Sequence, residues 1–220
     1  MSAKRPKVVA FDVVETLFSL APVDDALRPL GVPLPLFFAW LLRDGFALAA
    51  AGDHRPFRSV AASALDGLAP GSGDAEREAV LDAFSRLPPQ PDAAPAVERL
   101  VSAGVPVVTL TNGGAGNTEH LLAAAGLDRY VERVISVDEA GRWKPAARPY
   151  VHATTRLGCR ASEVALVAVH PWDVHGASRA GLVTGWCSRS ASAFPEVFER
   201  PDVTGPDLVA VADGLLRLPM

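Results

Sequence analysis

Short apolar runs recur through the second half of the chain and alternate with segments of helical length and composition. The runs are 105–110, 134–137, 164–169 and 183–187. The segments between and around them are 96–103, 118–125, 149–157 and 173–180, each followed by glycine. A continuous apolar run indicates a strand buried on both faces, and glycine commonly follows a helix end. Strands that alternate with helices of about ten residues predict a doubly wound parallel sheet.

The first half of the chain has a different pattern. Val8–Phe11 is a short β-rich run that ends at Asp12, and no further strand is expected before residue 88. The helices expected in between are 34–51, 57–65 and 75–87, within a helical block that starts near residue 20. Four prolines in 88–95 then mark a boundary, because proline cannot continue a helix.

This pattern predicts an α/β fold, namely a Rossmann-like core of residues 1–18 and 88–220 with a helical cap inserted at 19–87. Such a cap is expected over the carboxyl edge of the sheet, where folds of this kind bind ligands. The last apolar run, 208–211, is expected to add an edge strand.

Composition and charge narrow the function. Of 220 residues, 49% are hydrophobic and 21% charged, which is enough to form a sizeable core. A net charge of −4 provides no basic surface for nucleic acid or anionic membranes. Arg43, Asp44 and Gly45 interrupt the most apolar window, so no membrane span is expected. Two cysteines cannot make a disulfide framework, and a cytoplasmic location is expected.

Residues with useful chemistry lie at or after the predicted strand ends. Asp12 follows the first strand, Thr111 and Asn112 follow the second, and Lys144 precedes a proline. A fourth segment, 170–173, carries His170 and Asp173. The carboxyl ends of parallel strands meet at one edge, so these distant segments are expected to form one site.

This ordered set resembles the four sequence motifs of the haloacid dehalogenase superfamily, and the resemblance covers the whole chain. The stretch 136–145 and the Trp-Asp-x-x-Gly-Ala pattern at 172–177 are particularly similar to the L-2-haloacid dehalogenase (type II) branch. The resemblance implies a hydrolase with an aspartate nucleophile. Its expected reaction is hydrolytic dehalogenation of a small 2-haloalkanoic acid to the 2-hydroxy acid.

Asp12 is the expected nucleophile. A carboxylate can displace a leaving group from a tetrahedral carbon, and water can then hydrolyse the resulting enzyme ester. An ammonium group a few ångströms away keeps a carboxylate ionised, and Lys144 is the candidate. Thr16 either orients the Asp12 carboxylate through a hydrogen bond or caps the next helix. The sequence leaves both roles open.

The expected substrate is a small anion. Thr111 and Asn112 precede two glycines, which let backbone N–H groups approach a ligand, and this predicts an anion-binding turn. By resemblance, Asn112 would touch the halide or the substrate carboxylate. The resemblance also makes Arg43 of the cap the candidate cation for the substrate.

Val14 separates two enzyme classes. Phosphatases of the superfamily carry an acid at this place, because a departing alkoxide must be protonated. Valine cannot donate a proton, but a halide leaves without one. No metal or other cofactor is therefore expected, and Asp173 is expected to work beside Lys144. The alternative is a magnesium-dependent small-molecule phosphatase in which Asp173 would help to hold the metal.

The chain departs from the branch at Ala168, His170 and Glu15. A neutral His170 ring would accept a proton from the hydrolytic water, or His170 is structural and inert. These changes leave a third reading open, a catalytically weak protein with a binding or regulatory role. The oligomeric state, a homodimer included, also stays open.

Overall fold

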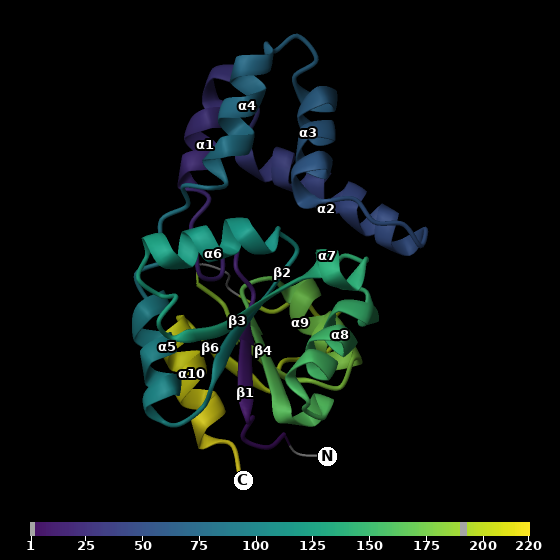
Figure 1. Ribbon diagram of the computed structural model, residues 1–220. Coiled ribbons are helices and arrows are strands. Elements are labelled where there is room, and N and C mark those ends of the chain that lie inside the picture. The colour runs from purple at the N-terminus through teal and green to yellow at the C-terminus, as the bar shows by residue number, and fades with distance from the viewer. Residues whose placement is uncertain (1–2, 190–192) are drawn as a thin grey trace.

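The protein is described by a computed structural model that covers residues 3–189 and 193–220 (Figure 1). Its sheet has six strands in the order β3-β2-β1-β4-β5-β6, and every neighbouring pair is parallel. The strands are β1 (Val8–Phe11), β2 (Val107–Thr111), β3 (Val131–Ser136), β4 (Val164–Ala168), β5 (Val183–Cys187) and β6 (Val203–Gly205). This is the doubly wound order, with its reversal at β1, and the predicted fold class is confirmed.

Helices cover both faces of the sheet because alternate residues of a strand point to opposite sides. Val9 and Phe11 of β1 belong to one buried cluster, and Val8 and Ala10 belong to another. The first cluster includes residues of α5 (Ala93–Ser102), α6 (Ala115–Ala124) and α10 (Leu208–Arg217). The second includes residues of α8 (Ala147–Leu157) and α9 (Pro171–Arg179). β1 is thus buried on both faces at the centre of a three-layer core.

The remaining long helices form the block that was predicted as a cap. They are α1 (Ala21–Leu27), α2 (Leu34–Ala50), α3 (Phe57–Leu68) and α4 (Asp74–Ala83). Figure 1 shows them grouped at one end of the sheet, away from both chain termini. They therefore lie over the edge where β1 ends and the candidate residues begin.

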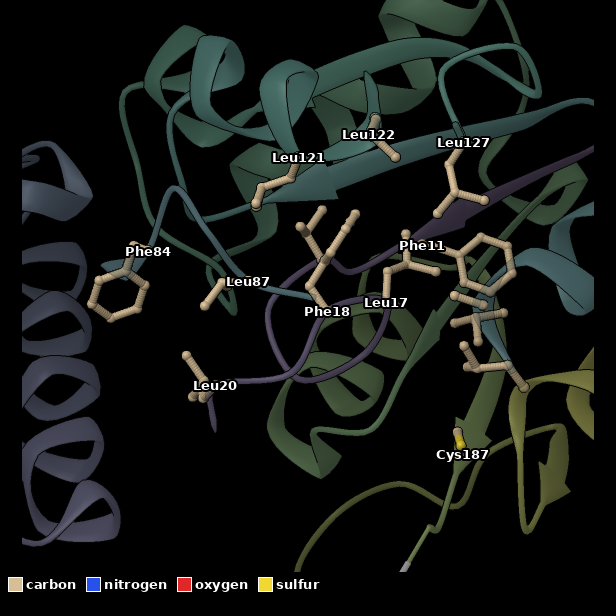
Figure 2. Close-up of a cluster of buried hydrophobic side chains, with 14 of the residues drawn as sticks. Phe11, Leu17, Phe18, Leu20, Phe84, Leu87, Leu121, Leu122, Leu127 and Cys187 are labelled. Carbon is tan, nitrogen blue, oxygen red and sulfur yellow. The ribbon is translucent and has the colours of Figure 1, made fainter. Parts of the chain in front are cut away.

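The chain leaves and re-enters the sheet region at neighbouring points. The amide of Ser19 donates to the carbonyl of Pro88 at 2.9 Å, and Phe18 pairs with Pro89 in an isolated antiparallel bridge. Phe18, Leu20 and Leu87 belong to the buried cluster drawn in Figure 2. The two connections to the cap are thus held side by side by backbone pairing and apolar burial.

The predicted edge strand at 208–211 is wrong. These residues form the first turn of α10, and the last strand is the three-residue β6. Leu208, Val211 and Leu215 are buried with helical spacing. Asp207 caps the helix, since its side chain accepts from the amide of Ala210 at 2.7 Å. An apolar run of four residues cannot by itself distinguish the two elements.

The third predicted strand, 134–137, is displaced toward the N-terminus. β3 covers Val131–Ser136, and Val137 begins the short helix α7 (Val137–Ala140). Ser136 is the N-cap of α7, and its side chain accepts from the amide of Asp138 at 3.1 Å. The first half of β3 is partly exposed and contains charged residues, so it does not appear as an apolar run in the sequence.

Among residues 3–189 and 193–220, no single helix is long and apolar enough to cross a membrane. Only the bent pair Ala21–Leu30 and Leu34–Ala50, with 102° between its members, passes a test of length and composition.

Gly45 of α2 provides a test of how the cap is seated. A Cβ atom there would lie 2.5 Å from Cζ3 of Trp143, a ring that is fully buried. We expect Gly45→Ala to lower the free energy of unfolding by about 1–3 kcal/mol, because the ring must move or the helix must shift. Urea denaturation measures this change.

Gly116→Ala is the matched control, since Gly116 lies in α6 and a Cβ there meets no atom within 4 Å. It should raise stability by about 0.5–1 kcal/mol, because alanine restricts the unfolded chain more than glycine does. Equal stability of Gly45→Ala and the unsubstituted protein would show that α2 does not rest on Trp143.

Candidate active site

The predicted residues meet at the carboxyl edge of the three central strands. Asp12 follows β1, Thr111 ends β2 and Asn112 follows it, and His170 lies just beyond β4. Strand order reverses at β1, which is where doubly wound sheets open a crevice for ligands. Asp173 enters from the first turn of α9, and Lys144 enters from the loop before α8.

Lys144 joins the two carboxylates. Its Nζ donates to Asp12 Oδ1 at 2.9 Å, to Asp173 Oδ2 at 2.6 Å and to the carbonyl of Leu110 at 2.7 Å. An ammonium group has three protons, so these contacts use all of them. The side chain is fully buried, which lowers the pKa of Lys144, but Asp12 and Asp173 outweigh burial and raise the pKa. Lys144 is therefore a fixed positive charge.

Asp12 is held as a carboxylate. Burial raises its pKa, but the charges and hydrogen bonds of Lys144 and His170 reverse this effect and hold the pKa well below its usual range. Thr16 Oγ1 donates to Asp12 Oδ2 at 2.8 Å and accepts from the amide of Val169 at 3.1 Å. The next helix begins only at Ala21, so of the two roles predicted for Thr16 the structure has the contact that orients Asp12.

His170 is placed between two acids. Its Nδ1 lies 3.2 Å from Asp12 Oδ2, and its Nε2 lies 2.9 Å from Glu15 Oε2. The ring stacks on Phe38 of the cap at 6.0 Å and on Trp172 at 5.0 Å between ring centroids. Burial lowers the pKa of His170, but the two carboxylates outweigh it and raise the pKa to about 9. At neutral pH the ring is an imidazolium, and not the neutral ring considered from the sequence.

Two members of this network were missing from the predicted site. Glu15 has a φ of 62°, in the left-handed region, and its side chain points to His170. The departure from the branch at Glu15 was the one signal for it in the sequence. The Tyr150 hydroxyl donates to Asp173 Oδ1 at 2.6 Å. The sequence offered no signal for Tyr150 beyond its place in a predicted helix.

Asp173 is fully buried between these partners. Burial raises its pKa, the Lys144 charge lowers it and Asp12 raises it again, with a net upward shift. Its side chain does not cap α9.

The turn after β2 has two separate contacts. Thr111 Oγ1 accepts from the amide of Gly113 at 2.9 Å. Asn112 Oδ1 accepts from the backbone amide of Lys144 at 2.9 Å, so the Asn112 side chain holds the Lys144 backbone. α6 follows with Gly114 as its N-cap and no side-chain cap, which leaves its first N–H groups beside the turn.

The structure does not place Arg43 in the site, contrary to prediction. The face of α2 that meets the site carries Phe38, Leu42 and Phe46, at a spacing of four residues. Arg43 points away from that face and pairs with Asp44 at 2.8 Å, and its guanidinium lies 4.2 Å from the Trp40 ring centroid. A shift of one residue along a helix rotates a side chain by about 100°, and the sequence did not fix the rotation of α2.

A small cavity of about 20 Å³ lies over Asp12. Its lining comes from the three strand ends and the cap: Asp12, Val14, Phe38, Leu42, Phe57, Thr111, Asn112, Gly113, His170 and Trp172. One water-sized group needs about 10–15 Å³ by this measure. The cavity thus has room for one reacting group in contact with the Asp12 carboxylate.

A model of the haloacid dehalogenase-like hydrolase family matches residues 6–181, a range that includes Asp12, Lys144 and Asp173. The chain belongs to this family.

The chain is similar in sequence to two dehalogenases and in structure to a third. Haloacetate dehalogenase H-2 of Moraxella sp. (strain B) is 28% identical over 225 residues, with 94% of this chain and 97% of the relative covered. (S)-2-haloacid dehalogenase 2 of Pseudomonas sp. (strain CBS-3) is 32% identical over 126 residues, and the chain spans only 55% of that relative's length. The structure of L-2-haloacid dehalogenase from Xanthobacter autotrophicus with chloropropionic acid covalently bound superimposes with a TM-score of 0.86 at 25% identity. That match covers 96% of this chain and 98% of the other.

Proposed function

We propose that this hydrolase releases halide from a 2-haloalkanoic acid through an ester on Asp12. The observation that carries the proposal is the Asp12 carboxylate, ionised by Lys144 and facing a small cavity under an apolar cap. The covalent chloropropionic acid complex of the Xanthobacter autotrophicus relative supports the same chemistry.

In the first step a carboxylate oxygen of Asp12 bonds to C2 of the substrate, and the carbon–halogen electron pair leaves with the halide. Val14 lines the cavity and has no proton to donate, and a halide needs none. Two groups that line this cavity would hold the substrate carboxylate, namely the Thr111 hydroxyl and the His170 imidazolium. They take the place of the cation predicted at Arg43.

The second step is hydrolysis of the ester, and here His170 changes its role. Esterification removes the negative charge of Asp12, so the pKa of His170 falls from about 9 and the ring loses a proton to solvent. The neutral ring then accepts one proton from the water that attacks the Asp12 carbonyl carbon. The departing alkoxide takes the other proton, which gives the 2-hydroxy acid and restores the carboxylate and the imidazolium.

We propose that these steps need no metal ion. The oxygens that a phosphatase would offer to magnesium already have protein donors: Asp12 is bonded to Lys144 and Thr16, and Asp173 to Lys144 and Tyr150. A fixed ammonium between the carboxylates also repels a second cation. The cluster does not fit magnesium, which counts against the phosphatase alternative.

A cytoplasmic location and a homodimer stay predictions.

Asp12→Asn should abolish halide release from 2-chloropropionate, because an amide is not a competent nucleophile. Unsubstituted enzyme in excess over substrate, in heavy-oxygen water, should show label in the peptide that contains Asp12. Asp128→Asn, at an exposed position, is the control and should keep full activity. Label in the first-turnover product, with none in the peptide, would mean that water attacks the substrate directly.

Halide release should persist after exhaustive treatment with a chelator, because Lys144 supplies the positive charge that a metal would otherwise provide. The assay compares untreated, chelated and magnesium-supplemented enzyme, on a haloacid and on a phosphate monoester. Loss of activity on chelation with recovery in magnesium would favour the phosphatase arrangement.

The proton transfer to His170 predicts an acid limb in the pH profile of kcat, since kcat reports the enzyme with bound intermediate. His170→Asn should remove this limb, slow ester hydrolysis by about 10²–10⁴-fold and let the covalent species accumulate. Glu15→Gln removes one carboxylate from the ring, so it should lower the pKa of His170 and move the limb to lower pH. Unchanged profiles in both variants would leave His170 a packing residue.

A further inference from the structure

A second and larger cavity lies next to the one over Asp12. Its volume is about 200 Å³, against about 20 Å³ for the space at the nucleophile. The two cavities share a wall, because Val14, Phe57, Thr111 and Gly113 line both of them. We call the larger cavity the side chamber.

The inner wall of the side chamber is apolar. Ala61 of α3, Leu81 of α4, Phe84 and Leu121 of α6 line it, and all four are buried. Phe84 and Leu121 are labelled in Figure 2 as members of the buried cluster where the cap approaches α6. A substrate group that entered here would leave water for a hydrocarbon surface.

Polar groups on the chamber rim are engaged with protein partners. The Asn117 amide donates to the carbonyl of Phe84 at 3.0 Å. Arg58 forms ion pairs with Glu78 and Asp82 on α4. These contacts keep a strong hydrogen-bonding donor and a cation occupied, so the chamber favours an apolar group over a second anionic one.

The space over Asp12 holds the reacting carbon and little more. A substituent on C2 larger than a methyl group has to extend past Val14 and Phe57, and the side chamber is the cavity that begins there. We propose that the side chamber binds the C2 substituent of the substrate. The preferred substrates are then 2-halo acids with an alkyl chain of four or more carbons on C2, or with an arylmethyl group. This inference rests on the proposed dehalogenase activity and specifies its substrate class.

A preference of this kind has a predictable size. Each methylene that moves from water into an apolar site contributes about fourfold to binding. 2-Bromohexanoate carries three more methylenes than 2-bromopropionate. The ratio of kcat/KM for the longer to the shorter acid should therefore reach roughly 60-fold, and 2-bromo-3-phenylpropionate should also be preferred.

Two variants test whether the preference comes from the side chamber. Ala61→Leu fills it from the inner wall, and Ser85→Leu narrows it from a half-buried position on the rim, where misfolding is less of a risk. Both should lower the long-to-short ratio at least tenfold. Ala79→Leu lies on the exposed face of α4, away from the chamber, and should keep the ratio. A flat dependence on chain length, or an unchanged ratio in both chamber variants, would overturn the proposal.

Failure of the dehalogenase proposal is separable from failure of the side chamber. Calorimetric titration with hexanoate and with propionate, which carry no leaving group, measures binding without turnover. If no haloacid releases halide, the proposed function fails. The chamber proposal then holds only if hexanoate binds more tightly than propionate and Ala61→Leu removes the difference. Equal binding of the two acids would overturn it.

Discussion

The buried ammonium of Lys144 is the interaction on which the site depends. Two carboxylates approach one another at buried positions, where burial raises the pKa of each and the Lys144 charge lowers both. Lys144 meets both and also the carbonyl of Leu110, while Asn112 fixes its backbone. Removing one partner from such a buried ion pair typically costs about 3–5 kcal/mol. The same charge therefore supports both the local fold and the reactivity of Asp12.

The core and the cap contribute different things to this centre. All the charges in contact with Asp12 come from the core, and His170 and Glu15 extend that network toward the rim. The cap contributes the aromatic and aliphatic side chains Phe38, Leu42 and Phe57. Among the residues that the structure describes, no arginine lines the space over Asp12. The core thus supplies the charged groups around Asp12, and the cap helices supply the apolar part of the cavity lining.

The sequence predicted the sheet and its catalytic edge because strong local signals coincide there. Fully buried strands appear in the sequence as apolar runs. Asp12, Lys144 and Asp173 occur in this order along the chain, each after one of these runs. Prediction failed where the apolar run was short, or where the result depended on the orientation of a helix. The segment 208–211 fits a strand as well as a helical turn. The direction of the Arg43 side chain depends on how α2 is rotated about its axis, which the sequence does not show. The tie between Tyr150 and Asp173 and the double pairing of His170 depend on three-dimensional proximity, which no local pattern contains.

The adjacent backbone connections at Ser19 and Pro88 have a consequence for how such a protein can change. The chain departs from the sheet and returns to it at almost the same place, so the helices between these points form an insertion whose two ends are adjacent. Insertions of this kind can be lengthened, shortened or exchanged with little disturbance to the host fold. The register of β1 against β2 and β4, which positions Asp12, comes from strand pairing within the core. New specificities can therefore arise when the cap helices are replaced and the sheet with its catalytic residues is kept.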